Sequence, residues 1–199
     1  FMNRNELQAC KDGYIYIHDQ SARLDTMNCC LFDVANVLKG GFEMGNVWYN
    51  EPKTLDTAFD VMGDIILSTA AQQYGGFTVP EVDKILAPYA EKSYRKYKEE
   101  FKKYVDPDWE LADDRAEKYA MDKVRRDFDQ GWQGIEYKLN TVGSSRGDYP
   151  FVTVTLGLGM ERFEKMCSIS LLELLKVGQG RARHKIPVLF PNIVFLYDE

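Results

Sequence analysis

Long apolar runs, clustered cysteines and an excess of positive charge are all missing from this sequence of 199 residues. No apolar run reaches the roughly 18 residues that a membrane-spanning helix needs, and residues 1–8 lack the apolar core of a signal peptide. The net charge is -6, so overall attraction to nucleic acid or to an anionic membrane is not expected. These absences predict a cytoplasmic protein that binds neither nucleic acid nor membrane.

The four cysteines are also sparse: they are Cys10, Cys29, Cys30 and Cys167. Their spacing contains no CxxC pair and no cysteine–histidine pair, so no zinc or other metal site is indicated. A disulfide scaffold is excluded by the low cysteine content, which suits a reducing compartment. The hydrophobic fraction of 45% is that of an ordinary globular protein.

Apolar spacing predicts several helices and strands along the chain. Strands alternate with helices, which favours an α/β fold with parallel strands in a single domain. Two consecutive long helices, from about Pro80 to Lys138, predict a helical hairpin. The expected helices cover residues 29–39, 54–73, 80–104, 109–138 and 161–176, and the clearest strands cover residues 151–156 and 187–197.

Cys29 is the first candidate for chemistry, because it lies in Asn28-Cys29-Cys30 at the expected start of a helix. The positive end of a helix dipole favours a thiolate, which is the reactive form of cysteine. The alternative is a small, buried, unreactive side chain. His18 could orient a substrate hydroxyl or serve as a structural, hydrogen-bonded histidine.

The segment from Asn140 to Phe151 is the most unusual loop. Its glycines would allow close backbone approach to a ligand, and Asn140, Ser144 and Ser145 offer hydrogen bonds. It precedes a strand, however, whereas a phosphate-binding loop usually follows one and opens a helix.

Residues 92–103 interleave Tyr94 and Tyr97 with charged side chains. One interpretation is an amphipathic surface helix. The other is a subunit interface with an anion site.

A series of short blocks, taken in order, resembles the large subunit of the class III, glycyl-radical ribonucleoside-triphosphate reductases. The resemblance spans essentially all 199 residues. Its blocks are Gly13–Asp19, Asn28-Cys29, Gly41–Asn46, Glu51–Lys53, Tyr74–Gly76, Leu86–Tyr89, Asn140-Thr141, Pro150–Thr153 and Phe190-Pro191. It implies an oxidoreductase that converts ribonucleotides to deoxyribonucleotides. It also implies that this chain forms the first half of a ten-stranded α/β barrel of parallel strands.

The resemblance assigns roles to individual residues. Cys29, rather than Cys30, is the expected catalytic cysteine that faces the ribose. The expected substrate-binding residues are Asn28, His18, Asn140, Ser144 and Ser145. A deoxynucleotide effector is expected on the helices near a homodimer interface, at Lys53, Asp64, Tyr94 and Lys96. Asp64 stands where relatives can carry a neutral amide, so its contacts with an effector are expected to differ from those of the relatives.

Several parts that the family mechanism needs have no counterpart here. They are a thiyl-radical cysteine on a finger loop, a glycyl radical, a four-cysteine zinc site and an ATP-binding cone. We therefore expect an internal fragment that holds no cofactor and is inactive alone. The complete reductase would use a radical-SAM activating enzyme and a ribonucleoside triphosphate. Residues 144–149 depart from the Asn-Gly-Gln-Thr of formate-using members, so formate or a small redoxin could be the reductant.

Two other functions remain open at this stage. One is a helical interaction module without chemistry, whose tyrosine- and lysine-rich face binds a partner. The other is a glycyl-radical enzyme that acts on a small carbon substrate, against which the Asn28-Cys29 pair and the effector helices argue. A glycyl-radical motif downstream in the same gene would favour the reductase.

Overall fold

The structure, a computed structural model, describes residues 3–14, 28–106, 109–141, 143 and 147–198. At its centre is a parallel sheet with the strand order β1-β4-β5-β8. The strands are β1 (Cys30–Leu31), β4 (Phe77–Val79), β5 (Val152–Leu156) and β8 (Asn192–Phe195). The expected α/β class with parallel strands is therefore confirmed.

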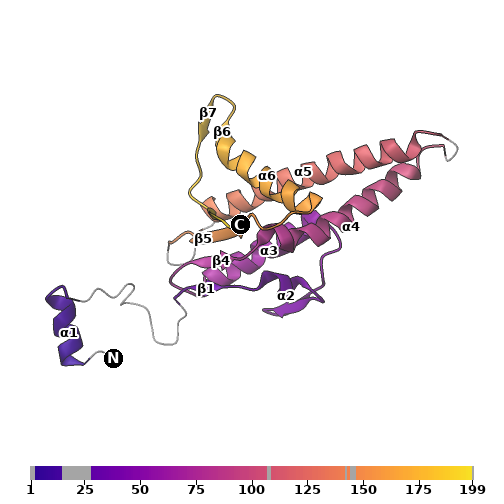
Figure 1. Cartoon of the computed structure of the whole chain (residues 1–199). Helices are drawn as coiled ribbons and strands as arrows, with labels where there is room; N and C mark the ends of the chain where they lie inside the picture. Colours follow the sequence, from indigo (N-terminus) through magenta and orange to yellow (C-terminus); the bar gives the residue numbers. More distant parts are fainter. Residues whose placement is uncertain (1–2, 15–27, 107–108, 142, 144–146, 199) are drawn as a thin grey trace.

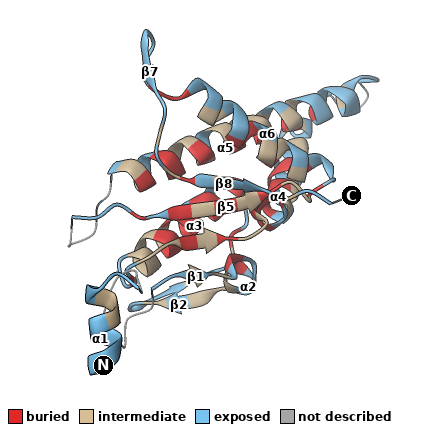
Figure 2. Cartoon of the chain, turned by 60° about the vertical axis from the view of Figure 1, so that its left-hand side comes forward, coloured by how far each residue is buried: buried red, intermediate tan, exposed pale blue. Residues whose placement is uncertain are grey.

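Four long helices bury one face of this sheet (Figures 1 and 2). They are α3 (Leu55–Ala70), α4 (Val82–Lys102), α5 (Ala112–Thr141) and α6 (Arg162–Val177). Alternation along β5 explains the arrangement: Val152, Val154 and Leu156 are buried, whereas Thr153 and Thr155 on the other face are half-buried. None of the described helices is both long and apolar enough to cross a membrane.

Aromatic side chains fill the space between α3 and α5. Trp132 and Phe128 of α5 are fully buried, and the ring of Phe59 on α3 packs edge-on against both. Complete burial of one such side chain stabilises a fold by about 1.5–3 kcal/mol. Gly131 lets the two helices approach, because a Cβ atom there would lie 2.2 Å from the Phe59 ring.

Helices α4 and α5 form the expected hairpin. The Tyr97 hydroxyl on α4 donates a hydrogen bond to Asp127 on α5 (2.8 Å), and nearer the hairpin tip Lys102 pairs with Asp113. These contacts run in opposite directions along the two helices, so the pair is antiparallel. The α4 helix continues through Pro88, as predicted, but it begins at Val82 rather than at Pro80.

The helix expected over residues 29–39 is wrong in its first half. Residues 30–31 form β1, and the short helix α2 (Val34–Leu38) begins only after Asp33. The Asp33 carboxylate accepts a hydrogen bond from the Asn36 amide (3.0 Å) and so caps α2. Leu31 belongs to the strand and Phe32 follows it directly. Together with the apolar residues of α2, these two residues have the spacing of one longer helix, which explains the wrong prediction.

Smaller elements complete the fold. The sequence did not predict two antiparallel hairpins, β2–β3 (Phe42–Met44 and Val47–Tyr49) and β6–β7 (Gln179–Arg181 and His184–Ile186). The last strand is shorter than the expected 187–197, because Pro191 lacks an N–H for the ladder and β8 begins after it. Near the N-terminus, α1 (Arg4–Lys11) has a capping box between Asn3 and Glu6.

Candidate active site

Several of the blocks that carry the family resemblance meet at one end of the sheet. Because the four strands are parallel, the segments that enter them lie side by side. We call this end, where the strands begin, the amino end of the sheet. The entering segments are Asn28-Cys29 before β1, Gly75-Gly76 before β4, Phe151 before β5 and Phe190-Pro191 before β8.

Cys29 lies against the two glycines that enter β4. The Gly76 amide donates a hydrogen bond to its sulfur (3.3 Å), and the Gly75 amide donates to the Asn28 carbonyl oxygen. A Cβ atom on Gly75 would lie 2.3 Å from Cys29 Sγ and 2.7 Å from Asn28 Oδ1. The contact therefore requires glycine at position 75. Cys29 is nevertheless exposed.

Aromatic rings continue this row towards β8. The ring of Phe151 lies 3.0 Å from the point where a Cβ atom of Gly76 would stand. On its other side Phe151 packs against Phe190, with 5.2 Å between ring centroids. The Phe77 amide donates to the Phe151 carbonyl oxygen (2.8 Å), which ties the β4 and β5 entrances together. Cys29 is thus connected to the β8 entrance by a continuous set of contacts.

The neighbouring thiol, Cys30, has a different environment. It is half-buried and packs against the hydrophobic core, since successive residues at a strand point to opposite faces. Burial raises the pKa of the Cys30 thiol, although a hydrogen bond with Gln73 acts in the opposite direction. Of these two cysteines, Cys29 is the accessible one.

The expected helix-start environment of Cys29 is not present. Cys29 precedes β1, and the nearest helix begins at Val34. The argument that a helix dipole activates this thiol is therefore wrong. Accessibility and the contacts with Gly75 and Gly76 remain as its structural basis.

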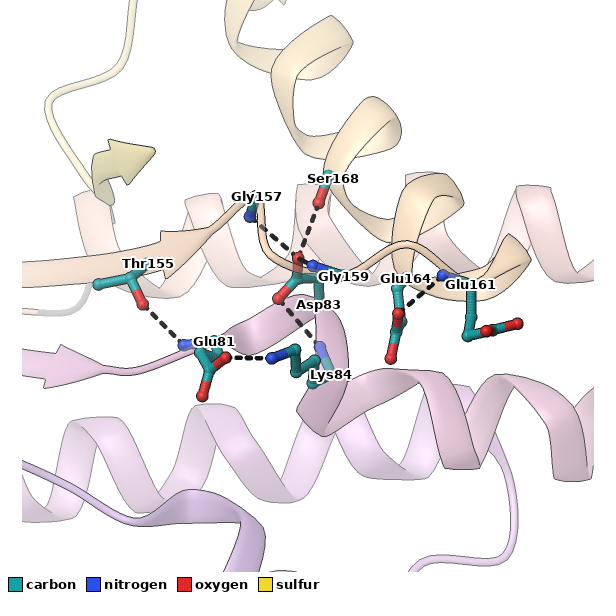
Figure 3. A network of polar contacts seen from close by, with 9 residues as sticks. All are labelled: Glu81, Asp83, Lys84, Thr155, Gly157, Gly159, Glu161, Glu164 and Ser168. Atoms are coloured by element: carbon teal, nitrogen blue, oxygen red, sulfur yellow. Dashed lines mark hydrogen bonds and ion pairs between the residues drawn. The ribbon is translucent and has the colours of Figure 1, made fainter. Parts of the chain in front are cut away.

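The opposite, carboxyl end of the sheet is occupied by the protein itself (Figure 3). Asp83 is fully buried, and its carboxylate accepts hydrogen bonds from the amides of Gly157 (3.0 Å) and Gly159 (3.2 Å). The Ser168 hydroxyl, 3.4 Å away, also donates to it. Ligands of open α/β sheets usually bind at the carboxyl end. Here Asp83 fastens α4 to the turn after β5.

Asn140 also reaches the amino end of the sheet, from the last turn of α5. Its Oδ1 accepts hydrogen bonds from the amides of Leu189 (3.1 Å) and Phe190 (3.3 Å). Asn28 and Asn140 thus lie at opposite ends of the same row. His18, Ser144 and Ser145, the other expected substrate-binding residues, lie outside the described residues.

The four expected effector residues do not form one cluster within the chain. Lys53 and Lys96 are exposed on neighbouring segments, because the Leu55 amide donates to the Ser93 hydroxyl (2.8 Å). Asp64 lies further along α3, and the ring of Tyr94 on α4 faces α6.

Asp64 and Tyr94 have protein partners of their own. Asp64 lies 4.0 Å from the Lys138 ammonium and 3.5 Å from the Tyr49 hydroxyl. Tyr94 is only 7% exposed, and the Arg162 guanidinium covers its ring at 4.3 Å.

Sequence reasoning did not assign roles to Gly75, Gly76 or Phe151, although each lies in a block that carries the resemblance. The double glycine before a short strand was an available signal, because glycine is needed where a backbone approaches another group closely. The structure also shows a buried hydrogen bond between the side chains of Gln179 and Glu136. No motif in the sequence indicated this pair.

Comparisons with known proteins identify the family of this chain. The family model described as anaerobic ribonucleoside-triphosphate reductase matches residues 1–199. A protein of that name from Enterobacteria phage T4 is 37% identical over 195 residues, which are 97% of this chain and 31% of that protein. One from Escherichia coli (strain K12) is 34% identical over 194 residues, which are 96% of this chain and 26% of that protein.

A solved structure shares the fold. It is the anaerobic ribonucleotide reductase from Thermotoga maritima in complex with dATP and CTP, with a TM-score of 0.56 at 13% identity. The match covers 83% of this chain and 27% of that one. This chain thus spans between a quarter and a third of the length of the curated relatives described above. It belongs to the anaerobic ribonucleoside-triphosphate reductase family.

Proposed function

We propose that this chain supplies one wall of the active site of an anaerobic reductase that converts ribonucleoside triphosphates to deoxyribonucleotides. One observation carries the proposal: blocks shared with the family, distant in sequence, converge at the amino end of the sheet around an accessible cysteine. We expect the full reaction to need further segments of the reductase, so that this chain alone forms no product.

The sheet supports a place in a larger barrel. Its helices cover one face, whereas Leu31 of β1 and Val194 of β8 are 72% and 46% exposed on the outermost strands. Exposed apolar positions on the end strands of a sheet favour pairing with further strands. We propose that these four strands belong to the first half of a ten-stranded barrel.

Cys29 is the proposed catalytic residue, with its thiol directed at the ribose. Gly75 and Gly76 hold it from one side, and Asn28 and His18 are proposed to contact the substrate. The glycyl radical, when present elsewhere in the reductase, would supply the one-electron oxidation that starts the reaction. We propose that the four-cysteine zinc site of the family lies in another segment of the reductase.

The helices carry the proposed regulation. Lys53 and Lys96 are both exposed and suit the phosphates of a deoxynucleotide effector, whereas Asp64 and the buried Tyr94 contact other parts of the chain and are left out of this site. We propose that this surface adjoins a homodimer interface. A radical-SAM activating enzyme and a formate or redoxin reductant complete the proposed partners of this cytoplasmic enzyme.

A pair of cysteine variants tests the proposed chemistry. In the complete reductase that carries this segment, Cys29→Ser should abolish deoxynucleotide formation, because serine lacks a thiol that can be oxidised. The matched variant Cys30→Ala should keep a measurable rate, because Cys30 packs against the core. Product is measured anaerobically by chromatography. Similar rates in the two variants would show that the assignment to Cys29 is wrong.

A further inference from the structure

Residues 179–190 leave the body of the protein between α6 and β8. Within them, the β6–β7 hairpin projects away from the helices (Figures 1 and 2). Both ends of this excursion are fastened to the last turns of α5. Glu136 and Asn140, one helical turn apart on α5, make the two attachments.

The first attachment is a buried side-chain pair. The Gln179 amide group donates a hydrogen bond to Glu136 Oε2, and the two residues are 9% and 0% exposed. The second carboxyl oxygen, Oε1, is buried without a hydrogen-bond partner among the described residues. This attachment holds the start of the excursion.

The second attachment uses the whole side-chain amide of Asn140. Its Nδ2 donates to the carbonyl oxygens of Phe190 (2.7 Å) and Glu136 (2.8 Å). Its Oδ1 accepts from the amides of Leu189 (3.1 Å) and Phe190 (3.3 Å). An asparagine side chain offers two N–H groups and two lone pairs. All four are used within the protein, so none remains for a substrate hydroxyl.

We infer that Asn140 is a positioning residue that fixes the entrance of β8, rather than a substrate ligand. The inference rests on the proposed function. Asn140 holds the backbone of Phe190 and so fixes the position of the Phe190 ring, which packs against Phe151. Phe151 in turn lies against Gly76 beside Cys29. A displacement of residues 189–190 would therefore reach the wall of the active site without any contact between Asn140 and substrate.

Amide hydrogen exchange tests the attachment in the chain itself. Asn140→Leu removes all four hydrogen bonds, and Asn140→Asp keeps an acceptor but loses both donors. We expect exchange of the Leu189 and Phe190 amides to become roughly tenfold faster or more with leucine, and less so with aspartate. Gln130→Leu, an exposed amide on the same helix, is the matched control and should change nothing there. Unchanged exchange in Asn140→Leu would overturn the inference.

Steady-state kinetics in the complete reductase separate positioning from substrate binding. With Asn140→Asp, we expect kcat to fall roughly tenfold or more while KM for the ribonucleoside triphosphate stays within about twofold. A comparable rise in KM with unchanged kcat would mean that Asn140 binds substrate. If the unmodified reductase forms no deoxynucleotide, the proposed function fails, whereas the exchange measurement still decides whether Asn140 fixes the β8 entrance.

Discussion

A single methyl group at Gly75 should disable the proposed active site without unfolding the protein. In Gly75→Ala, the new Cβ atom would stand 2.3 Å from Cys29 Sγ and 2.7 Å from the Asn28 carbonyl oxygen. Ordinary contacts between such atoms are at least about 3.5 Å, so the two segments must separate by about 1 Å. A displacement of about that size can cost a reaction roughly 100-fold in rate.

The cost in stability should be modest by comparison. Overpacking typically costs about 1–3 kcal/mol, and the lower part of that range applies because Cys29 and Asn28 are exposed and can shift. Two measurements follow: the rate of deoxynucleotide formation in the complete reductase, and the rate at which iodoacetamide alkylates Cys29. We expect the first to fall about 100-fold and the second to change because the Gly76 amide no longer bonds to the sulfur.

Gly134→Ala provides the control. A Cβ atom at Gly134 meets nothing within 4 Å, and the residue lies inside α5. Alanine should therefore stabilise the helix by about 0.5–1 kcal/mol and leave the reaction rate unchanged. If Gly75→Ala keeps the rate and the alkylation of the unmodified protein, the contact between Gly75 and Cys29 does not define the active site.

Three further predictions concern stability, pH and assembly. Gly131→Ala should lower the free energy of unfolding by about 1–3 kcal/mol, measured by urea titration, because its Cβ atom would overlap the Phe59 ring. Burial raises the pKa of Glu136 above its ordinary value of 4.5. The folded protein therefore favours the protonated form of Glu136, and the stability that this form contributes is complete below pH 4.5 and is lost as pH rises through the folded-state pKa. Glu136→Gln should flatten this part of the stability–pH curve in thermal melts. We expect the helical hairpin of residues 80–138 to pack against a second copy of the chain, so light scattering at micromolar concentration should show a dimer that a deoxynucleoside triphosphate tightens. A monomer with and without nucleotide would contradict this interface.

Local sequence patterns predicted the long elements well. The α3 helix appears where apolar spacing from Leu55 indicated it, and α6 begins after Glu161 as expected. The hairpin of α4 and α5 and the strand at Val152–Leu156 are also confirmed. Long periodic segments carry enough apolar positions to define one buried face.

Short elements could not be predicted in this way. The strand β1 has two residues, too few for a period to appear, and its apolar neighbours suggested a helix instead. That error also gave Cys29 the wrong local environment. The sequence predicted Cys29 as the reactive residue through the family resemblance, and this role remains a prediction.

The sequence by itself determined the α/β class, the long helices and the family, because these depend on local periodicity and on ordered blocks of residues. Only the tertiary structure decided which groups meet. Gly75 contacts Cys29 across 46 positions of the chain. The side-chain amide of Asn140 makes all of its hydrogen bonds with its own helix and with residues 189–190. Such contacts follow from the parallel pairing of strands and from the packing of α5 against the sheet, which bring together residues that are distant in sequence, and no local pattern records either arrangement.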